Sequence, residues 1–316
     1  MSPRHIALAA LVAAVWGVNF VFIEIGLANF PPLLFSALRF LAAAVPAVFF
    51  VGSPRVAWRW VIAVGLILGV AKFGLLFIGM HAGMPAGLSS LVLQSQAVFT
   101  TGFAAVLLRE RPRRAQVAGM LVAAAGIGLI AVDGGLTAPA SAFALVVGAA
   151  GCWGLANIVL RRASPPDMFR FMVWVSAVAT LPLFALSLLT EGPDRDLAAL
   201  AGLNLPGVGA ILYVALASTL FGFGVWGFLL REYDASTVAP FSLLVPIVGM
   251  SSAALLLGEP LTPLRCAAAA LVIAGVGATV LRRRKGQTSG GAPGGSTGSP
   301  AGAPSASSRS TASVSR

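Results

Sequence analysis

The chain has 316 residues, of which 58% are hydrophobic and only 10% are charged, and its mean hydropathy is +0.93. Soluble domains carry about 25% charged residues, so this composition excludes an ordinary soluble fold and indicates an integral membrane protein. The formal net charge is +11, but the cations lie in short clusters between apolar runs and near the C-terminus, which does not fit a nucleic-acid-binding face.

Ten apolar segments follow one another along the chain, each close to the roughly 20 residues that a helix needs to cross a bilayer. We expect transmembrane helices at residues 5–27, 33–51, 59–81, 88–108, 114–132, 141–159, 168–190, 207–230, 236–257 and 264–281. The remaining C-terminal residues are rich in Gly, Ser, Pro and Ala, a composition typical of a disordered tail, which we place at 286–316. The predicted fold is an all-α integral membrane protein with ten transmembrane helices.

The basic residues predict the orientation of these helices. With both termini in the cytoplasm, the inner segments hold Arg4, Arg55, Arg59, Arg109, Arg111, Arg113, Arg114, Arg161, Arg162, Arg170, Arg231, Arg282, Arg283, Arg284 and Lys285. The outer loops then hold only Arg195 and Arg265. Because cytoplasmic loops of membrane proteins carry the excess of Lys and Arg, we expect a multi-pass protein of the inner (cytoplasmic) membrane with both termini inside.

The chain also contains an internal repeat. "WGVNF" at 16–20 in the first segment has a counterpart in "WGLAN" at 153–157 in the sixth, and aligning Glu110 with Glu259 also aligns Gly126 with Gly275. We therefore expect two five-helix repeats, 1–137 and 138–285. Five is odd, so the second repeat enters the membrane inverted, an arrangement that supports alternating access to a central site. We expect a cavity between the repeats that is lined mainly by the first, third, fourth, sixth, eighth and ninth segments. Glu110 and Glu259 stand at helix ends, where we expect them to cap a helix or pair with arginine.

Several motifs together resemble the EamA family of the drug/metabolite transporter superfamily. They are "WGVNF", "PPLLFSALRF", "MPAGLSSLVLQSQAVFT" and the "RER" and "GEP" ends of the fourth and ninth segments, and the resemblance extends to about residue 281. Within the family, the chain is similar to exporters of cysteine and O-acetylserine. The resemblance implies a ten-helix carrier of amino acids or related metabolites. One departure is that family members commonly have a Lys where this chain has Glu24, whereas here Lys72 stands in the third segment.

The candidate substrate-binding residues are polar, aromatic or helix-breaking side chains inside the apolar segments. They are Trp16, Asn19, Glu24, Arg39, Lys72, Gln94, Gln96, Trp153, Asn157 and Pro246. An amide has the donors and the acceptor needed to read a zwitterionic amino acid. Each also has a structural interpretation: an Asn can hold helices together, a Trp can belong to an aromatic belt, and a Pro can simply kink its helix.

Two neighbouring glutamines allow a sharper prediction. Residues two apart on a helix point about 200° from each other, so one of Gln94 and Gln96 should face a given cavity. We expect Gln96 to face the cavity and Gln94 to bond a neighbouring helix.

Three charged residues fall at a similar depth in the outer half of the membrane. Glu24 lies near the end of the first segment, Arg39 in the second and Lys72 in the third. An ionised group there is costly unless it is paired, so one hypothesis is that Glu24 pairs with Lys72 or Arg39 and leaves one cation free for the carboxylate of the cargo. The alternative is that Arg39 bonds backbone carbonyls, Glu24 reaches the interface, and only Lys72 lines the path.

The residues that would support catalysis or metal binding are sparse. The chain has two cysteines, Cys152 and Cys266, and two histidines, His5 and His81, none at metal-ligand spacing, and it has no phosphate loop or nucleophile elbow. We expect no catalytic residue, no metal and no cofactor. The predicted function is a secondary transporter that binds a small-molecule substrate within the lipid bilayer and exports amino acids or related metabolites. The alternatives are a broader drug or metabolite exporter, an intramembrane enzyme and a structural membrane protein; the oligomeric state is open.

Overall fold

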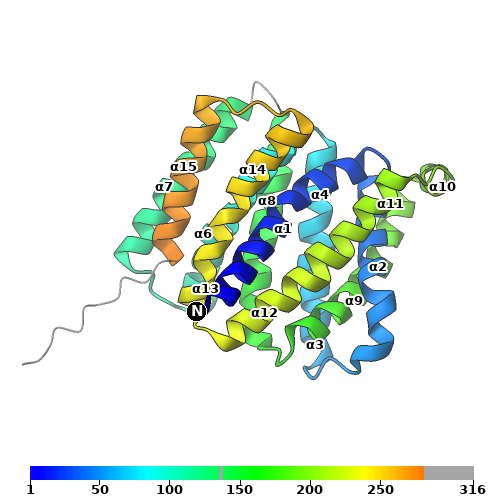
Figure 1. The fold of residues 1–316 in the computed structure, drawn as a ribbon, viewed down its shortest axis with the longest axis horizontal. Helices are drawn as coiled ribbons and strands as arrows, with labels where there is room; N and C mark the ends of the chain where they lie inside the picture. Colours follow the sequence, from blue (N-terminus) through cyan, green and yellow to red (C-terminus); the bar gives the residue numbers. More distant parts are fainter. Residues whose placement is uncertain (135–137, 281–316) are drawn as a thin grey trace, which may run out of the picture. The chain divides into compact units, whose positions relative to one another are not determined.

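The computed structural model describes residues 1–134 and 138–280, and these ranges are helical and contain no strand (Figure 1). The described residues belong to one compact unit, Met1–Arg282. The predicted junction between the repeats at residue 137 and the predicted tail at 286–316 lie outside the described residues. The all-α prediction is confirmed.

The helices follow the order expected from hydropathy. The first five spans consist of α1 (Pro3–Leu27), α2 (Pro32–Val51), α3 (Trp58–Val64), η1 (Gly65–Lys72), α4 (Phe73–His81), α5 (Ala86–Val92), η2 (Leu93–Ser95), α6 (Gln96–Leu107) and α7 (Arg114–Gly134). The second five, with one extra short helix, consist of α8 (Ala140–Ala163), α9 (Met168–Thr190), α10 (Pro193–Ala201), α11 (Leu205–Leu212), η3 (Tyr213–Phe221), α12 (Gly222–Glu232), α13 (Ala235–Val238), η4 (Ala239–Leu243), α14 (Leu244–Leu257) and α15 (Pro263–Val280).

Ten apolar spans emerge from these elements. Within the described chain, nine continuous helical stretches are long and apolar enough to cross a membrane, and a shorter apolar helix over Pro263–Thr279 supplies the tenth. The predicted span boundaries agree with these helices to within a few residues. Only α10 was not expected; it is short, and its first turn holds Asp194 and Asp196, which suit a helix N-terminus but not a hydrophobic core.

Local sequence explains where several helices begin and end. The Ser2 side chain accepts the backbone N–H of His5 at the start of α1, and Pro3 occupies the first turn, where its missing N–H costs nothing. Asn204 caps α11 in the same way by accepting the N–H of Gly207. At the end of α14, Gly258 has φ 70°, a left-handed conformation that glycine adopts without strain.

Irregular backbone occurs at matched places in the two halves. The third and eighth spans contain the π-helical segments η1 and η3, and the fourth and ninth contain the 3₁₀ segments η2 and η4. A π-helical turn bonds each N–H to the carbonyl five residues back and is found frequently at functional sites. These four spans therefore differ from the regular helices in the same way in both halves.

The packing between the halves is reciprocal. The α1 helix packs on α14 and α8 packs on α6, so the first span of each half meets the fourth of the other. Likewise α2 packs on α9, and α7 packs on α15 at one edge of the bundle (Figure 1). The inverted arrangement predicted from the sequence repeat accounts for this pattern, because a two-fold relation pairs equivalent helices across the axis.

The motif glycines allow these close contacts. A Cβ at Gly17 would lie 2.6 Å from the Cβ of Val248 on α14, and a Cβ at Gly154 would lie 2.7 Å from the Cβ of Phe99 on α6. Each "WG" motif therefore places a glycine where the backbone of its helix approaches the opposite half. Small residues at such crossings are typical of packed transmembrane helices.

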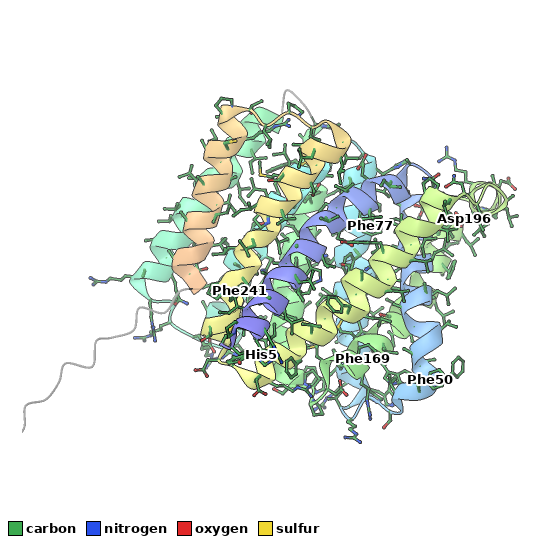
Figure 2. All side chains as sticks on the ribbon, in the orientation of Figure 1. His5, Phe50, Phe77, Phe169, Asp196 and Phe241 are labelled. Atoms are coloured by element: carbon green, nitrogen blue, oxygen red, sulfur yellow. The ribbon has the colours of Figure 1, made fainter. Side chains whose placement is uncertain are left out.

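Aromatic side chains lie both in the interior and on the surface that would face lipid. Phe77 is fully buried among the helices, whereas Phe50 is 87% exposed on α2 (Figure 2). A bilayer would cover such apolar side chains, so their exposure carries no cost in the membrane.

Candidate functional site

A cavity of about 290 Å³ lies between the two halves, close to the lower end of the ~300–1,000 Å³ range of small-molecule pockets. Its lining comes from the first, third, fourth, sixth, eighth and ninth spans, with Met168 added from α9. The inverted repeat predicted this set of spans. The lining is mostly apolar and aromatic, with a few polar groups, which suits a small organic ligand.

The cavity extends toward the end of the bundle that carries the N-terminus. Leu160 near the end of α8, Met168 at the start of α9 and Leu230 near the end of α12 all line it. These helix ends lie at the N-terminal end, because Ala9 of α1 packs with Leu229 of α12 (Figure 1).

The opposite end is held by carboxylates that cap helices across the two halves. Glu259 accepts the backbone N–H of Ala86 at 2.7 Å and that of Gly87 at 3.1 Å, at the start of α5. Burial raises the pKa of the Glu259 carboxyl, and the N–H groups of Gly87 and Ala86 and the charge of Arg265 offset part of this increase. A carboxylate at a helix N-terminus stabilises both the free N–H groups and the helix dipole.

The second half contributes a similar cap to α2. Glu191 accepts the N–H groups of Leu33 at 2.8 Å and Leu34 at 3.0 Å. Glu110, which aligns with Glu259, instead forms an exposed ion pair with Arg161 at 2.6 Å. Glu110 and Glu259 thus have the structural roles expected of them, but one lies at an exposed end and the other at a closed end.

The two motif tryptophans occupy related walls of the cavity. The Trp16 indole donates to the backbone carbonyl of Ser218 in η3 at 2.9 Å and packs against Phe223 and Trp226. Trp153 lies with its ring 4.6 Å from the Lys72 ammonium, next to η1. Each tryptophan therefore contacts the π-helical segment of the opposite half, which a lipid-facing belt residue would not do.

Lys72 places an ammonium group in the cavity wall. Its Nζ lies 3.3 Å from the centre of the Phe73 ring, and the Arg39 guanidinium lies 3.6 Å from the same centre. Arg39 does not line the cavity; it is 2% exposed, and its Nη1 donates to Thr219 Oγ1 at 3.2 Å. Neither cation forms an ion pair with a carboxylate of the described residues.

The hypothesis that Glu24 pairs with one of these cations is wrong. Among the described residues, Glu24 forms no ion pair with Lys72 or Arg39, it lies outside the cavity lining, and its buried Oε2 has no hydrogen-bond partner. The sequence placed Glu24 and Lys72 at similar depth, but depth does not determine which way a side chain faces around its helix. The structure agrees with one feature of the alternative hypothesis: of the three charged residues, only Lys72 lines the cavity.

Both glutamines line the cavity, contrary to the expectation that only one would. Gln94 donates to the Ser242 carbonyl of η4 at 3.2 Å, and Gln96 accepts from the Asn157 amide at 2.7 Å. The prediction treated the fourth span as a regular helix, whereas the 3₁₀ segment η2 ends at Ser95. The two long side chains reach different neighbours, η4 for Gln94 and α8 for Gln96.

The remaining candidates divide between the wall and the packing. Asn19 lines the cavity, is 7% exposed, and has a side-chain oxygen without a hydrogen-bond partner in the described part of the chain. Asn157 also lines it, but its amide is held by Gln96 and by Thr100 Oγ1. Pro246 is buried in the first turn of α14 and is absent from the lining, which fits a structural role at the change from 3₁₀ to α-helix.

Several lining residues were missed because most are apolar and the others carry only a small hydroxyl group. They are Phe20, Leu68, Phe73, Leu76, Ser90, Leu93, Leu160, Met168, Ser218, Phe223, Trp226, Leu230, Ser242 and Val245. Trp226 alone carried a signal, as an indole within an apolar span. Among residues 1–134 and 138–280, no three His, Cys, Asp or Glu side chains gather as a metal site needs.

Comparisons with known proteins agree with this arrangement. The model of the EamA-like transporter family matches residues 4–132 and again residues 140–281. A protein of Salmonella typhimurium LT2 named "Probable amino-acid metabolite efflux pump" is 41% identical over 283 residues, covering 87% of this chain and 94% of that protein. A protein of Escherichia coli K12 with the same name is 39% identical, covering 90% of this chain and 98% of that protein.

More distant proteins extend the comparison. A protein of Streptantibioticus cattleyicolor named "Probable terminal-alkyne amino-acid exporter" is 29% identical, covering 89% of this chain and 96% of that protein. A solved structure described as "Crystal structure of protein" matches with a TM-score of 0.62 and 18% identity, covering 90% of this chain and all of that chain, and so shares the fold. Since the family model matches both halves of the sequence, the chain belongs to the EamA-like transporter family.

Proposed function

We propose that this protein is a secondary transporter of the cytoplasmic membrane that exports amino acids or related metabolites, such as cysteine or O-acetylserine, by alternating access. The observation that carries the proposal is the cavity between the two halves, with the Lys72 ammonium in its wall and without a protein carboxylate bound to it. The names of the relatives from Salmonella and E. coli support the cargo class.

The lining residues have distinct proposed roles. Lys72 attracts the cargo carboxylate, while Arg39 adds positive potential from behind Phe73. Asn19 and Gln94 offer uncharged hydrogen-bonding groups, and the aromatic rings enclose the apolar part of the cargo. The cargo leaves chemically unchanged, and its own gradient or a proton gradient drives the movement.

The difference between the two ends of the cavity supports alternating access. The lining residues extend to the end of the bundle near the N-terminus. At the other end, Glu259 caps α5 and Glu191 caps α2. We propose that the N-terminal end faces the cytoplasm and that residues 1–137 and 138–285 are the two inverted repeats. Movement of one repeat against the other then opens the capped end and closes the first.

Flux measurements test the transport function. Purified full-length protein in proteoliposomes loaded with labelled cysteine or O-acetylserine should release the compound unchanged, faster than empty liposomes do. Lys72→Met should lower the rate, whereas Arg59→Met, which removes a charge from an exposed residue outside the cavity, should not. Conversion of the compound without movement across the bilayer would instead identify an enzyme.

Cysteine labelling tests the orientation. In a variant without Cys152 and Cys266, a cysteine at Ser164 should react only with a reagent that reaches the cytoplasmic side, and one at Asp194 only from the outside. Labelling of both from one side would contradict the proposed topology.

A further inference from the structure

The charges around the cavity are unbalanced. Lys72 is the one ionisable side chain among the described lining residues, and Arg39 lies directly behind Phe73. Both are almost fully buried, with exposed fractions of 3% and 2%, and neither has a carboxylate partner within the described chain. Buried charges are normally paired, so this part of the molecule lacks an anion.

The hydrogen bonds of the two cations leave room for a ligand. Among the described residues, Arg39 Nε and Nη2 have no hydrogen-bond partner, and the Lys72 ammonium lies over the rings of Phe73 and Trp153. Aromatic faces stabilise a cation but do not neutralise it. A carboxylate at Lys72 would supply the missing negative charge.

The same arrangement disfavours a second positive charge. The α-ammonium of a zwitterionic amino acid lies next to its carboxylate, so it would enter the field of both cations, and the described lining has no carboxylate to receive it. Repulsion between like charges is strong in a poorly solvated site. The cavity therefore suits a carboxylate whose neighbouring nitrogen is uncharged.

An uncharged partner for such a nitrogen is present. Asn19 is 7% exposed, lines the cavity, and has a side-chain oxygen that no described residue hydrogen-bonds. One amide oxygen can accept the single N–H of an acylated amine, whereas an ammonium brings three donors and a charge. Another amide oxygen of the lining, Gln96 Oε1, already accepts from the Asn157 amide.

We infer that, within the amino-acid-related cargo of the proposed function, the site prefers N-acylated amino acids with an apolar or aromatic body over the free zwitterions. Its aromatic lining residues suit such a body; they are Trp16, Phe20, Phe73, Trp153, Phe223 and Trp226. This inference rests on the proposed function, since it assigns the cargo class of the same cavity.

Two matched pairs of compounds isolate the charge on the amine. N-acetyl-L-serine and O-acetyl-L-serine are constitutional isomers that differ in whether the nitrogen is acylated or charged, and N-acetyl-L-phenylalanine is compared with L-phenylalanine. We measure competition for transport in proteoliposomes and thermal stabilisation of the full-length protein in detergent. The N-acyl compound of each pair should act at a concentration at least tenfold lower.

Variants show whether Lys72 causes the preference. Lys72→Met should reduce the ratio within each pair to less than threefold, Lys72→Arg should restore it, and Arg59→Met should leave it unchanged. Thermal unfolding without ligand shows that each variant is folded. Binding of the neutral N-acetyl-L-phenylalaninamide should change less than twofold in Lys72→Met.

The outcomes separate this inference from the proposed function. If the zwitterions are transported at equal or lower concentrations than their N-acyl partners, the inference is wrong but the proposed transport function is not affected. A preference that persists in Lys72→Met also overturns it. If no compound of either pair binds or moves, both proposals fail.

Discussion

Arg39 and Lys72 lie on the two faces of one ring, that of Phe73. The guanidinium carbon is 3.6 Å and the ammonium nitrogen 3.3 Å from the centre of this ring, and two cations this close could not share one face. Arg39 also lies 3.7 Å from the centre of the Phe40 ring. The aromatic rings thus keep two buried positive charges apart while stabilising each.

This relationship predicts that Phe73 stabilises the fold beyond its apolar volume. Phe73→Leu should lower the free energy of unfolding in detergent by about 1–3 kcal/mol, because it removes buried contacts and the ring that both cations contact. Thermal or denaturant unfolding measures the loss. Phe50→Leu is the matched control, since Phe50 is 87% exposed, and it should change stability by less than about 0.5 kcal/mol. Equal effects of the two changes would contradict the proposed role of the ring.

The motif glycines predict a steric effect on each half. Gly17→Ala would bring a Cβ to 2.9 Å from the Gly249 nitrogen, and Gly154→Ala would bring one to 2.9 Å from the Thr100 nitrogen. Backbone cannot move aside as a flexible side chain can, so each change should cost about 1–3 kcal/mol of unfolding free energy.

Gly102 provides the control for these substitutions. A Cβ at Gly102 would meet no atom within 4 Å, so Gly102→Ala should be neutral or stabilise by up to about 1 kcal/mol through helix propensity. Unfolding of the three variants, measured under the same conditions, tests this prediction. Destabilisation by Gly102→Ala as large as by Gly17→Ala would argue against close packing as the cause.

The Glu259 cap predicts a loss of stability when the carboxylate is removed. Glu259→Ala leaves the N–H groups of Ala86 and Gly87 without their acceptor and should cost about 1–2 kcal/mol. Glu110→Ala removes an exposed ion pair with Arg161 and should cost less than about 1 kcal/mol. The order of these two losses, measured by unfolding in detergent, checks the assignment; the reverse order would refute it.

Glu259 also predicts a pH dependence. Burial raises its pKa in the folded protein above the ordinary value of 4.5, so the contribution to stability is fully present below that value and is lost as pH rises through the raised pKa. The unfolding free energy of the parent protein should therefore fall relative to that of Glu259→Gln between pH 4 and 7. Curves that remain parallel over this range would show that the carboxyl does not titrate differently on folding.

The hydrogen bond between Gln96 and Asn157 predicts coupled substitutions. Their side chains meet at 2.7 Å, so Gln96→Ala and Asn157→Ala should be less harmful together than their sum, with a coupling of about 0.6–1.7 kcal/mol. A double-mutant cycle in unfolding free energy measures it. Asn157→Ala combined with Gln116→Ala is the control, because Gln116 bonds Arg113 and shares no partner with Asn157, and these effects should add.

Hydropathy and the repeat predicted the spans and the set that surrounds the cavity, because burial in lipid requires long apolar runs and the inverted repeat places equivalent spans at the centre. Lys72, named from the sequence as a charged residue within an apolar span, lines the cavity. The pairing of Glu24 and the facing of Gln94 failed because composition gives the depth of a residue but not its direction around the helix. The segments η1 and η3 could not be expected either, since a shift of one hydrogen bond leaves hydropathy unchanged.

The π-helical segments make the backbone itself determine which side chains line the cavity. Lys72 is the last residue of η1, and Thr219, which bonds Arg39, lies in η3 and donates to the carbonyl of Val214 five residues earlier. Restoring regular α-helix in η1 would shift the register by one residue, which turns a side chain by about 100°. A redesign that keeps every cavity residue but straightens this span would therefore turn the ammonium out of the cavity wall, and sequence identity at these positions would no longer guarantee the same cavity.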